Sequence, residues 1–167
     1  MEYIIRNMQT EDIQQVQEVA KISWNSTYEN IIPLPIQDSF LQSAYSDERM
    51  KSRLENSYLF VAETDKKVIG FANFSPLNEN GEIELGAIYL DPRHQGAGIG
   101  TALLQKGIST IGGIKKIYIN VEKDNSIGKT FYQAKGFEIV SEKIRKKVRN
   151  LEAFSIQQES KWNNNNK

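Results

Sequence analysis

The glycines at positions 96, 98 and 100 form the part of this sequence best suited to bind an anion. They follow an apolar, strand-like stretch that ends in Asp91-Pro92, and an amphipathic helix begins directly after them. Because glycine has no Cβ, the backbone can approach an anion closely, and the first N–H groups of the helix point at it with the positive end of the helix dipole. The spacing predicts a site for a phosphate or pyrophosphate, although such a turn can also serve chain geometry alone.

Two familiar phosphate-binding patterns do not match this segment. The dinucleotide-binding fingerprint requires a glycine where Thr101 stands. A nucleotide-triphosphate loop requires a leading glycine ahead of Gly128-Lys129-Thr130, and Lys123 occupies that position. The ligand is therefore expected to be a different phosphate compound.

A second segment downstream carries another ordered set of residues: Asn125, the pair Phe131-Tyr132, and the pair Gly136-Phe137. Together with Gln95-x-x-Gly98-x-Gly100, these residues resemble the two signature blocks of the GNAT N-acetyltransferase superfamily, in the expected order. The resemblance covers about residues 5–140. It implies a GNAT fold and an enzyme that uses acetyl-CoA as acyl donor, with no metal.

The resemblance also assigns the contacts to acetyl-CoA. The pyrophosphate would bind to the turn formed by Gln95, Gly96, Ala97, Gly98, Ile99, Gly100 and Thr101. The backbone of Ile88, Tyr89 and Leu90 would pair with the pantetheine amides as an added strand does. Asn125 would hydrogen-bond the pantetheine arm, cap its own helix, or do both.

Acetyl transfer to an amine requires removal of a proton, because a primary ammonium has a pKa of about 10.4. Glu84 matches the carboxylate that many GNAT enzymes use as general base, often through a water molecule, and Glu82 on the same strand face is the reserve candidate. Two such glutamates can equally form a plain polar face. Tyr132 matches the tyrosine that GNAT enzymes use as general acid, which protonates the departing thiolate; alternatively, it packs on its helix face. A backbone N–H within residues 88–90 would stabilise the negative charge that develops on the thioester oxygen.

The predicted elements form a single α/β (α+β) domain with a mixed, mostly antiparallel central sheet and helices on both faces. A first strand is expected at residues 3–6, a hairpin around the turn at 64–67, and further strands at 82–90, 117–121 and from 137. Helices are expected over residues 13–24, from Ile36, after a Ser46 cap, over 99–111 and over 125–134. Gly86 predicts a bulge in the strand at 82–90, and in GNAT proteins such a bulge opens a V-shaped gap between the two central strands.

Two regions give weaker patterns. The segment from Trp24 to Tyr45 reads as irregular and aromatic, either packed like a lid or forming a wall of the acceptor pocket. After Val140 the expected last strand has only Leu151–Gln158 as a modest candidate. The basic run at residues 143–149 is expected to lie on a solvated face.

Composition limits the possible partners. The 167 residues suit one domain, expected over residues 1–160, followed by a disordered polar tail at 161–167. Lys plus Arg and Asp plus Glu both number 21, so no overall basic charge attracts nucleic acid or anionic lipid. The lack of cysteine and the single histidine, His94, argue against a thiolate nucleophile and a metal site. Without a recognisable targeting segment or a membrane-spanning run, the sequence predicts a cytoplasmic protein.

The acceptor is expected to be a small-molecule amine, similar to a polyamine or an amino compound. Relatives that acetylate ribosomal-protein N-termini carry a glutamate where this chain has Asn120, which disfavours a peptide acceptor. The layout around Trp24 and Tyr28 is more similar to bacterial small-molecule enzymes. A protein acetyltransferase and a non-catalytic acyl-CoA-binding module remain alternatives, and a homodimer is possible. The sequence leaves open the identity of the amine and the length of the acyl group.

Overall fold

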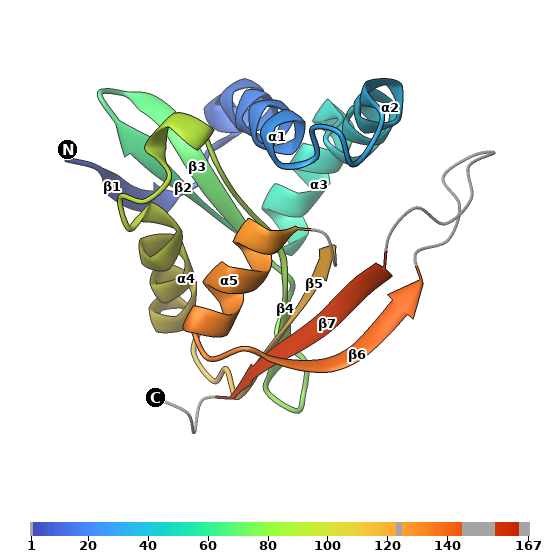
Figure 1. The fold of residues 1–167 in the computed structure, drawn as a ribbon. Helices are drawn as coiled ribbons and strands as arrows, with labels where there is room; N and C mark the ends of the chain where they lie inside the picture. Colours follow the sequence, from blue (N-terminus) through green and yellow to red (C-terminus); the bar gives the residue numbers. More distant parts are fainter. Residues whose placement is uncertain (1, 123–124, 145–155, 164–167) are drawn as a thin grey trace.

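The computed structural model describes residues 2–122, 125–144 and 156–163. Fourteen elements follow one another along the chain (Figure 1). They are β1 (Ile4–Asn7), η1 (Thr10–Asp12), α1 (Ile13–Thr27), α2 (Leu34–Ala44), α3 (Asp47–Asn56), β2 (Tyr58–Thr64), β3 (Lys67–Phe74), β4 (Glu82–Leu90), η2 (Pro92–His94), α4 (Ile99–Thr110), β5 (Lys116–Glu122), α5 (Ser126–Ala134), β6 (Glu138–Ile144) and β7 (Ile156–Asn163).

Short-range signals account for most of these boundaries. The predicted hairpin joins β2 to β3, and its turn residues Asp65 and Lys66 both have positive φ, as a tight hairpin turn requires. Ser46 caps α3 by accepting a hydrogen bond from the Arg49 N–H at 3.2 Å, as predicted. Gly136 follows α5 with φ 90°, a conformation that ends a helix at little cost for glycine.

The strands form one seven-stranded sheet in the order β1-β2-β3-β4-β5-β7-β6. All neighbours are antiparallel except β4 and β5, which are parallel. That parallel pairing covers only Glu82–Glu84 against Lys116–Tyr118, so the remainder of β4 separates from β5. The predicted mixed, mostly antiparallel GNAT sheet with a splay between its central strands is confirmed.

The predicted bulge lies at Gly86. In the pairing with β3, Ala87 faces Asn73 and Leu85 faces Phe74, so Gly86 is the extra residue in β4. One extra residue exchanges the two faces of a strand for all residues beyond it. Side chains at odd positions of β4 therefore point to one side of the sheet before the bulge and to the other side after it.

Helices cover both faces of the sheet, as predicted (Figure 1). One face packs against α4 and forms the α4-side core, which includes Phe60, Phe74, Ile83, Leu85 and Leu103. The opposite face packs against α1 and forms the α1-side core, which includes Val16, Met50, Val61, Phe71 and Ala87. Leu85 and Ala87 thus belong to different cores, as the exchange of faces at Gly86 requires.

Two expectations need correction. The segment from Trp24 to Tyr45 is more helical than expected, because α1 continues to Thr27 and α2, the helix expected from Ile36, begins earlier, at Leu34, directly after Pro33. The last strand is β7, which extends to Asn163, so the tail expected from residue 161 starts too early. The earlier part of the candidate Leu151–Gln158, up to residue 155, lies outside the described residues, as do positions 145–149 of the basic run.

Candidate active site

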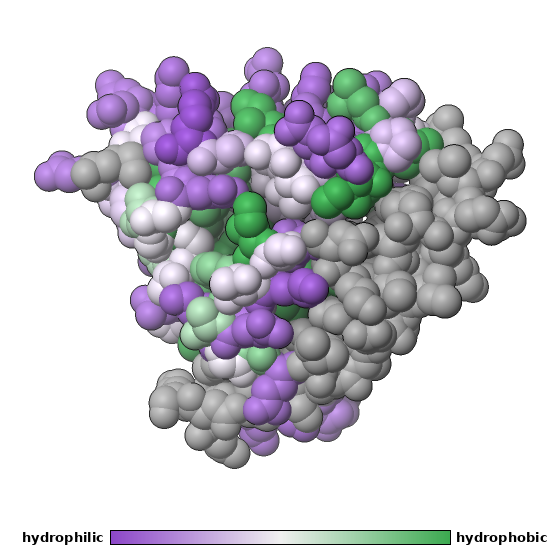
Figure 2. Space-filling view, in the orientation of Figure 1, coloured by the Kyte–Doolittle hydropathy of each residue, from purple (hydrophilic) through white to green (hydrophobic). Residues whose placement is uncertain are grey.

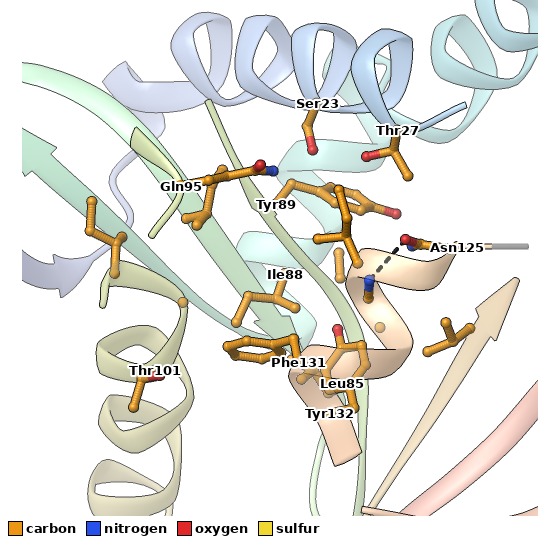
Figure 3. Close-up of a pocket in the computed structure, with 18 of the residues that line it drawn as sticks. Ser23, Thr27, Leu85, Ile88, Tyr89, Gln95, Thr101, Asn125, Phe131 and Tyr132 are labelled. Carbon is orange, nitrogen blue, oxygen red and sulfur yellow. Dashed lines mark hydrogen bonds between the residues drawn. The ribbon is translucent and has the colours of Figure 1, made fainter. Parts of the chain in front are cut away.

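A cavity of about 340 Å³ lies where β4 and β5 separate, between α1 on one side and α4 and α5 on the other (Figure 3). It is lined by Ser23, Thr27, Tyr28, Leu85, Gly86, Ala87, Ile88, Tyr89, Leu90, Gln95, Gly96, Gly98, Ile99, Gly100, Thr101, Asn120, Val121, Asn125, Ile127, Gly128, Phe131 and Tyr132. All but one of the predicted cofactor-binding residues line this cavity; the exception is Ala97. The two predicted signature blocks therefore meet at one place.

One end of the cavity is formed by the start of α4. Gly96 and Gly98 have φ 82° and 80°, and Gly98 is the residue that precedes the helix. A Cβ built on either glycine would meet no protein atom within 4 Å, so the space beside both backbones is open. The first N–H groups of a helix have no partner within it, and they carry the positive end of its dipole. This end can hold an anion such as a pyrophosphate.

Gly100 has a different function from its neighbours. A Cβ at Gly100 would lie 3.2 Å from the Phe131 ring, so its lack of a side chain lets α4 and α5 approach closely. The packing holds α5, which carries Tyr132, against α4, whose start forms one end of the cavity. Spacing alone grouped Gly100 with the glycines expected to bind an anion, because sequence cannot separate close packing from ligand contact.

The short helix η2 is fixed by a carboxylate that sequence reasoning did not identify. Asp91 is buried and accepts hydrogen bonds from the backbone N–H of Arg93 at 3.0 Å and from its guanidinium at 2.6 Å and 3.0 Å. These bonds hold the pKa of Asp91 below its usual value. Asp91 thereby orients the turn that leads into Gln95 and the glycines. Asp before Pro was a visible signal for such a cap.

Asn125 caps its own helix. Its Oδ1 accepts a hydrogen bond from the Gly128 N–H at 2.9 Å, which is drawn as a dashed line in Figure 3. A Cβ at position 128 would lie 2.6 Å from Nδ2 of Asn125, so glycine there makes room for the cap. The capping alternative of the sequence analysis is thus present in the structure, and the same side chain lines the cavity.

Tyr132 points its hydroxyl into the cavity from α5 (Figure 3). Its ring packs edge-on against Phe131 and Phe137, with centroid distances of 5.2 Å and 5.3 Å. Burial raises the pKa of Tyr132 above its ordinary value, and Tyr89 raises it further. The phenol therefore keeps its proton across the neutral and mildly alkaline range, as a proton donor must.

The two glutamates lie outside the cavity lining. The Glu84 side chain is exposed, and its backbone N–H donates to the Ser75 hydroxyl at 2.9 Å. The Glu82 carboxylate accepts hydrogen bonds from Asn78 at 3.1 Å and from the Tyr118 hydroxyl at 3.3 Å. Leu85, the residue after Glu84, lines the cavity, but Glu84 itself does not. Direct contact between the Glu84 carboxylate and an amine bound in the cavity is therefore not part of this arrangement.

The α1 side of the cavity contains residues that sequence reasoning mostly missed. Ser23 and Thr27 lie four residues apart on the last turns of α1, and Asn120 lines the cavity from β5. Ser23 is buried, although it is polar, and a serine on an apolar helix face was an available signal. Tyr28 lines the cavity, whereas Trp24 instead stacks on Phe40 with ring centroids 4.4 Å apart.

The surface around the cavity mouth is mixed. Figure 2 shows hydrophilic residues along the upper edge of this face, over α1, and an apolar patch at the upper right, over the α2 region. Two large apolar side chains are well exposed: Leu34 at the start of α2 is 55% exposed and Ile127 on the first turn of α5 is 67% exposed.

Within the described residues, no three His, Cys, Asp or Glu side chains cluster as a metal site would need, and no helix is long and apolar enough to cross a membrane.

Comparisons with known proteins agree with this geometry. Residues 16–137 match the model of the Acetyltransferase (GNAT) family. The chain is 36% identical over 145 residues to an uncharacterized N-acetyltransferase, YuaI, of Bacillus subtilis. This alignment covers 83% of this chain and 82% of the relative. The chain is also 31% identical over 143 residues to a spermidine N(1)-acetyltransferase of Thermoplasma acidophilum, in an alignment that covers 81% of this chain and 88% of the relative.

Solved structures show the same fold. A PaiA N-acetyltransferase from Thermoplasma acidophilum, crystallised with coenzyme A, superposes with a TM-score of 0.82 at 26% identity and covers 97% of this chain and 100% of the other. A ribosomal-protein-S18-alanine N-acetyltransferase from Escherichia coli gives a TM-score of 0.73 at 18% identity, covering 97% and 94%, which is a likeness of fold alone. The family match, the splayed sheet and the two signature blocks lead to one conclusion: the chain belongs to the GNAT family and is an acetyl-CoA-dependent N-acetyltransferase.

Proposed function

We propose that this enzyme transfers the acetyl group of acetyl-CoA directly to a primary amine of a small molecule. The observation that carries the proposal is that the open anion site at Gly96 and Gly98 and the hydroxyl of Tyr132 belong to one cavity. A phosphate-bearing donor held at one end of the cavity would place its reactive end deeper, between β4 and α5. The similarity to a relative named as a spermidine acetyltransferase supports a small amine as acceptor.

The residues around the splay would divide the work of binding. The N–H groups at the start of α4 bind the pyrophosphate, and the edge of β4 at Ile88–Leu90, beyond the residues that pair with β5, pairs with the pantetheine amides. Acetyl-CoA supplies an activated thioester. A backbone N–H of the same stretch stabilises the charge that develops on the carbonyl oxygen, because it is already oriented and needs no reorganisation.

Two side chains would handle protons. Tyr132 donates its phenolic proton to the departing sulfur. Glu84, whose carboxylate is exposed and one residue from the cavity lining, accepts a proton from the acceptor's ammonium group through a water molecule rather than by contact, which leaves the neutral amine to attack the thioester carbon.

A peptide acceptor is the second candidate. The cavity position that the relatives acting on ribosomal-protein N-termini fill with glutamate is Asn120 in this chain, and Asn120 lines the cavity. This departure from the pattern of those relatives disfavours a peptide acceptor. We therefore place small amines first.

The proposal is tested by measuring thiol release from acetyl-CoA with a panel of amines, including spermidine, tyramine, glucosamine and a short peptide.

Tyr132→Phe should lower kcat about 100-fold, because a general acid contributes on that order, and should leave the affinity for coenzyme A within about twofold. Glu84→Gln should lower kcat at neutral pH, with the loss shrinking as pH rises toward the amine's pKa of about 10.4, and Glu79→Gln, in the turn before β4, is the control. A wild-type protein that binds coenzyme A but acetylates none of these amines would contradict the proposal and favour a binding module.

A further inference from the structure

Three tyrosines line the cavity and a fourth lies behind it. Tyr28, Tyr89 and Tyr132 are part of the lining, and Tyr45 is buried in the α1-side core against Tyr89, with ring centroids 6.5 Å apart. Tyr132 serves the thiol side of the proposed reaction. The side chain of Tyr89 has no role in that scheme, although its backbone was assigned to the pantetheine arm.

The bulge at Gly86 determines where the Tyr89 side chain goes. Beyond the bulge, Ile88 and Leu90 pack against the α4-side core, whereas Tyr89 packs against the α1-side core. Figure 3 shows Tyr89 reaching from β4 toward Thr27 at the end of α1. Tyr89 and Tyr132 therefore approach the cavity from opposite sides of the sheet, and their interaction raises the pKa of Tyr132.

The ring of Tyr89 is held by aromatic neighbours. Phe71 contacts it edge-on with centroids 5.6 Å apart and planes at 77°, and Tyr45 meets it at 60°. Such edge contacts fix the plane of a ring and add to its packing energy. The hydroxyl at the end of the ring is then presented in one place, which a group that orients a substrate needs.

Tyr45 is itself firmly anchored. Its carbonyl accepts a hydrogen bond from Gln17 at 2.8 Å, its N–H donates to the Leu41 carbonyl at 2.9 Å, and the Arg53 guanidinium lies 4.8 Å above its ring. Burial raises the pKa of Tyr45 well above its ordinary value, and the neighbouring Tyr89 raises it further. Tyr45 thus stays protonated.

We infer that the Tyr89 hydroxyl binds the acceptor amine, and that Tyr45 is a positioning residue that holds this hydroxyl in place. Tyr45 holds the Tyr89 ring through their tilted ring contact, and a phenolic oxygen can accept two hydrogen bonds, so a bond donated by the Tyr45 hydroxyl would leave room for a second from the amine N–H. That contact would turn the nitrogen lone pair toward the acetyl carbon, between Tyr89 on the amine side and Tyr132 on the thiol side. The inference rests on the proposed function and extends it to the acceptor subsite.

The test uses Tyr89→Phe, Tyr45→Phe and the double variant, because phenylalanine keeps the ring and removes only the hydroxyl. Tyr58→Phe is the matched control, since Tyr58 is exposed on β2 and does not line the cavity. Acceptor KM is measured at saturating acetyl-CoA with spermidine, tyramine and glucosamine, and coenzyme A affinity by calorimetry. Tyr89→Phe should raise the acceptor KM about tenfold and Tyr45→Phe about threefold, with coenzyme A affinity unchanged within about twofold.

The double variant separates positioning from general structural support. If Tyr45 acts through Tyr89, the double variant should be no worse than Tyr89→Phe alone. Losses that multiply would overturn the positioning role, and an unchanged acceptor KM in Tyr89→Phe would overturn the inference as a whole. Absence of transfer by the wild-type enzyme to every amine would reject the proposed function and this inference together, whereas normal transfer by Tyr89→Phe rejects the inference alone.

Discussion

Gly98 illustrates how much of this site can be predicted from single residues. Its φ of 80° and the empty space beside it were both implied by a glycine placed just before an amphipathic helix. The role of Gly100 in packing against Phe131 could not be predicted, because that contact joins two helices distant in sequence. The place of Glu84 outside the cavity lining could not be predicted either, because it depends on where β4 separates from β5.

Gly98→Val should abolish measurable coenzyme A binding. A β-branched side chain is strained at this φ, and its Cβ would occupy space that the pyrophosphate needs. Calorimetry or a thermal-shift assay with coenzyme A checks this. Gly112→Val is the control, because a Cβ at Gly112 meets nothing within 4 Å and its φ lies outside the left-handed region. Normal affinity in Gly98→Val would show that the phosphates bind elsewhere.

At the scale of elements, local signals predicted helix caps and the β2–β3 hairpin, but they located β7 only in part, because the candidate Leu151–Gln158 overlaps it at residues 156–158. Its sequence, Ile156–Asn163, is mostly polar, and it pairs through its backbone with β5 on one side and β6 on the other. A strand held by two neighbours needs no apolar alternation along its whole length. The β-strand propensity of such a segment therefore says little about its place in the sheet.

A second element-scale feature ties β1 to the start of α1. Asp12 is buried and accepts hydrogen bonds from the Arg6 guanidinium at 2.7 Å and 2.9 Å and from the Gln9 N–H at 2.8 Å. The bond with Arg6 is the main reason that the pKa of Asp12 lies below its ordinary value. The charged carboxylate is thus favoured in the folded state.

Asp12→Asn should lower the free energy of unfolding at pH 7 by about 2 kcal/mol, the usual scale for a hydrogen bond to a charged group. Because the folded-state pKa is depressed, this stabilisation is present above the unfolded pKa of about 3.9 and is lost as pH falls through the folded value. Urea unfolding at pH 7 and pH 3 should therefore show the difference between variant and wild type shrinking in acid. Asp65→Asn, in the exposed hairpin turn, is the control; a difference independent of pH would contradict the assignment.

At the scale of the whole molecule, two groups of strands meet at a narrow junction. Among the described strands, the β1–β4 group pairs with the β5–β7 group through three residue pairs between β4 and β5. The sequence predicted this splay through Gly86, while the length of the junction depends on how the two halves pack. A ligand lying in the splay contacts both halves at once.

Coenzyme A should therefore stabilise the protein as a unit. At a concentration of about 100 times Kd, binding to the folded state alone adds about 2.7 kcal/mol, which corresponds to a rise in Tm of about 5–10 °C for a chain of this size. A thermal melt with increasing coenzyme A measures this, and Gly98→Val should show little rise. Separate melting of the two halves, with only one half responding, would contradict a ligand that joins them.

The place of β7 between β5 and β6 has a consequence for biosynthesis. During translation, β5 and β6 leave the ribosome before the strand that will lie between them and pair with both, because β7 follows β6 in the chain. The first four strands can associate as soon as β4 has been made, whereas the other half of the sheet must wait for β7. A nascent chain stalled before Ile156 would expose two unpaired strand edges to chaperones and proteases.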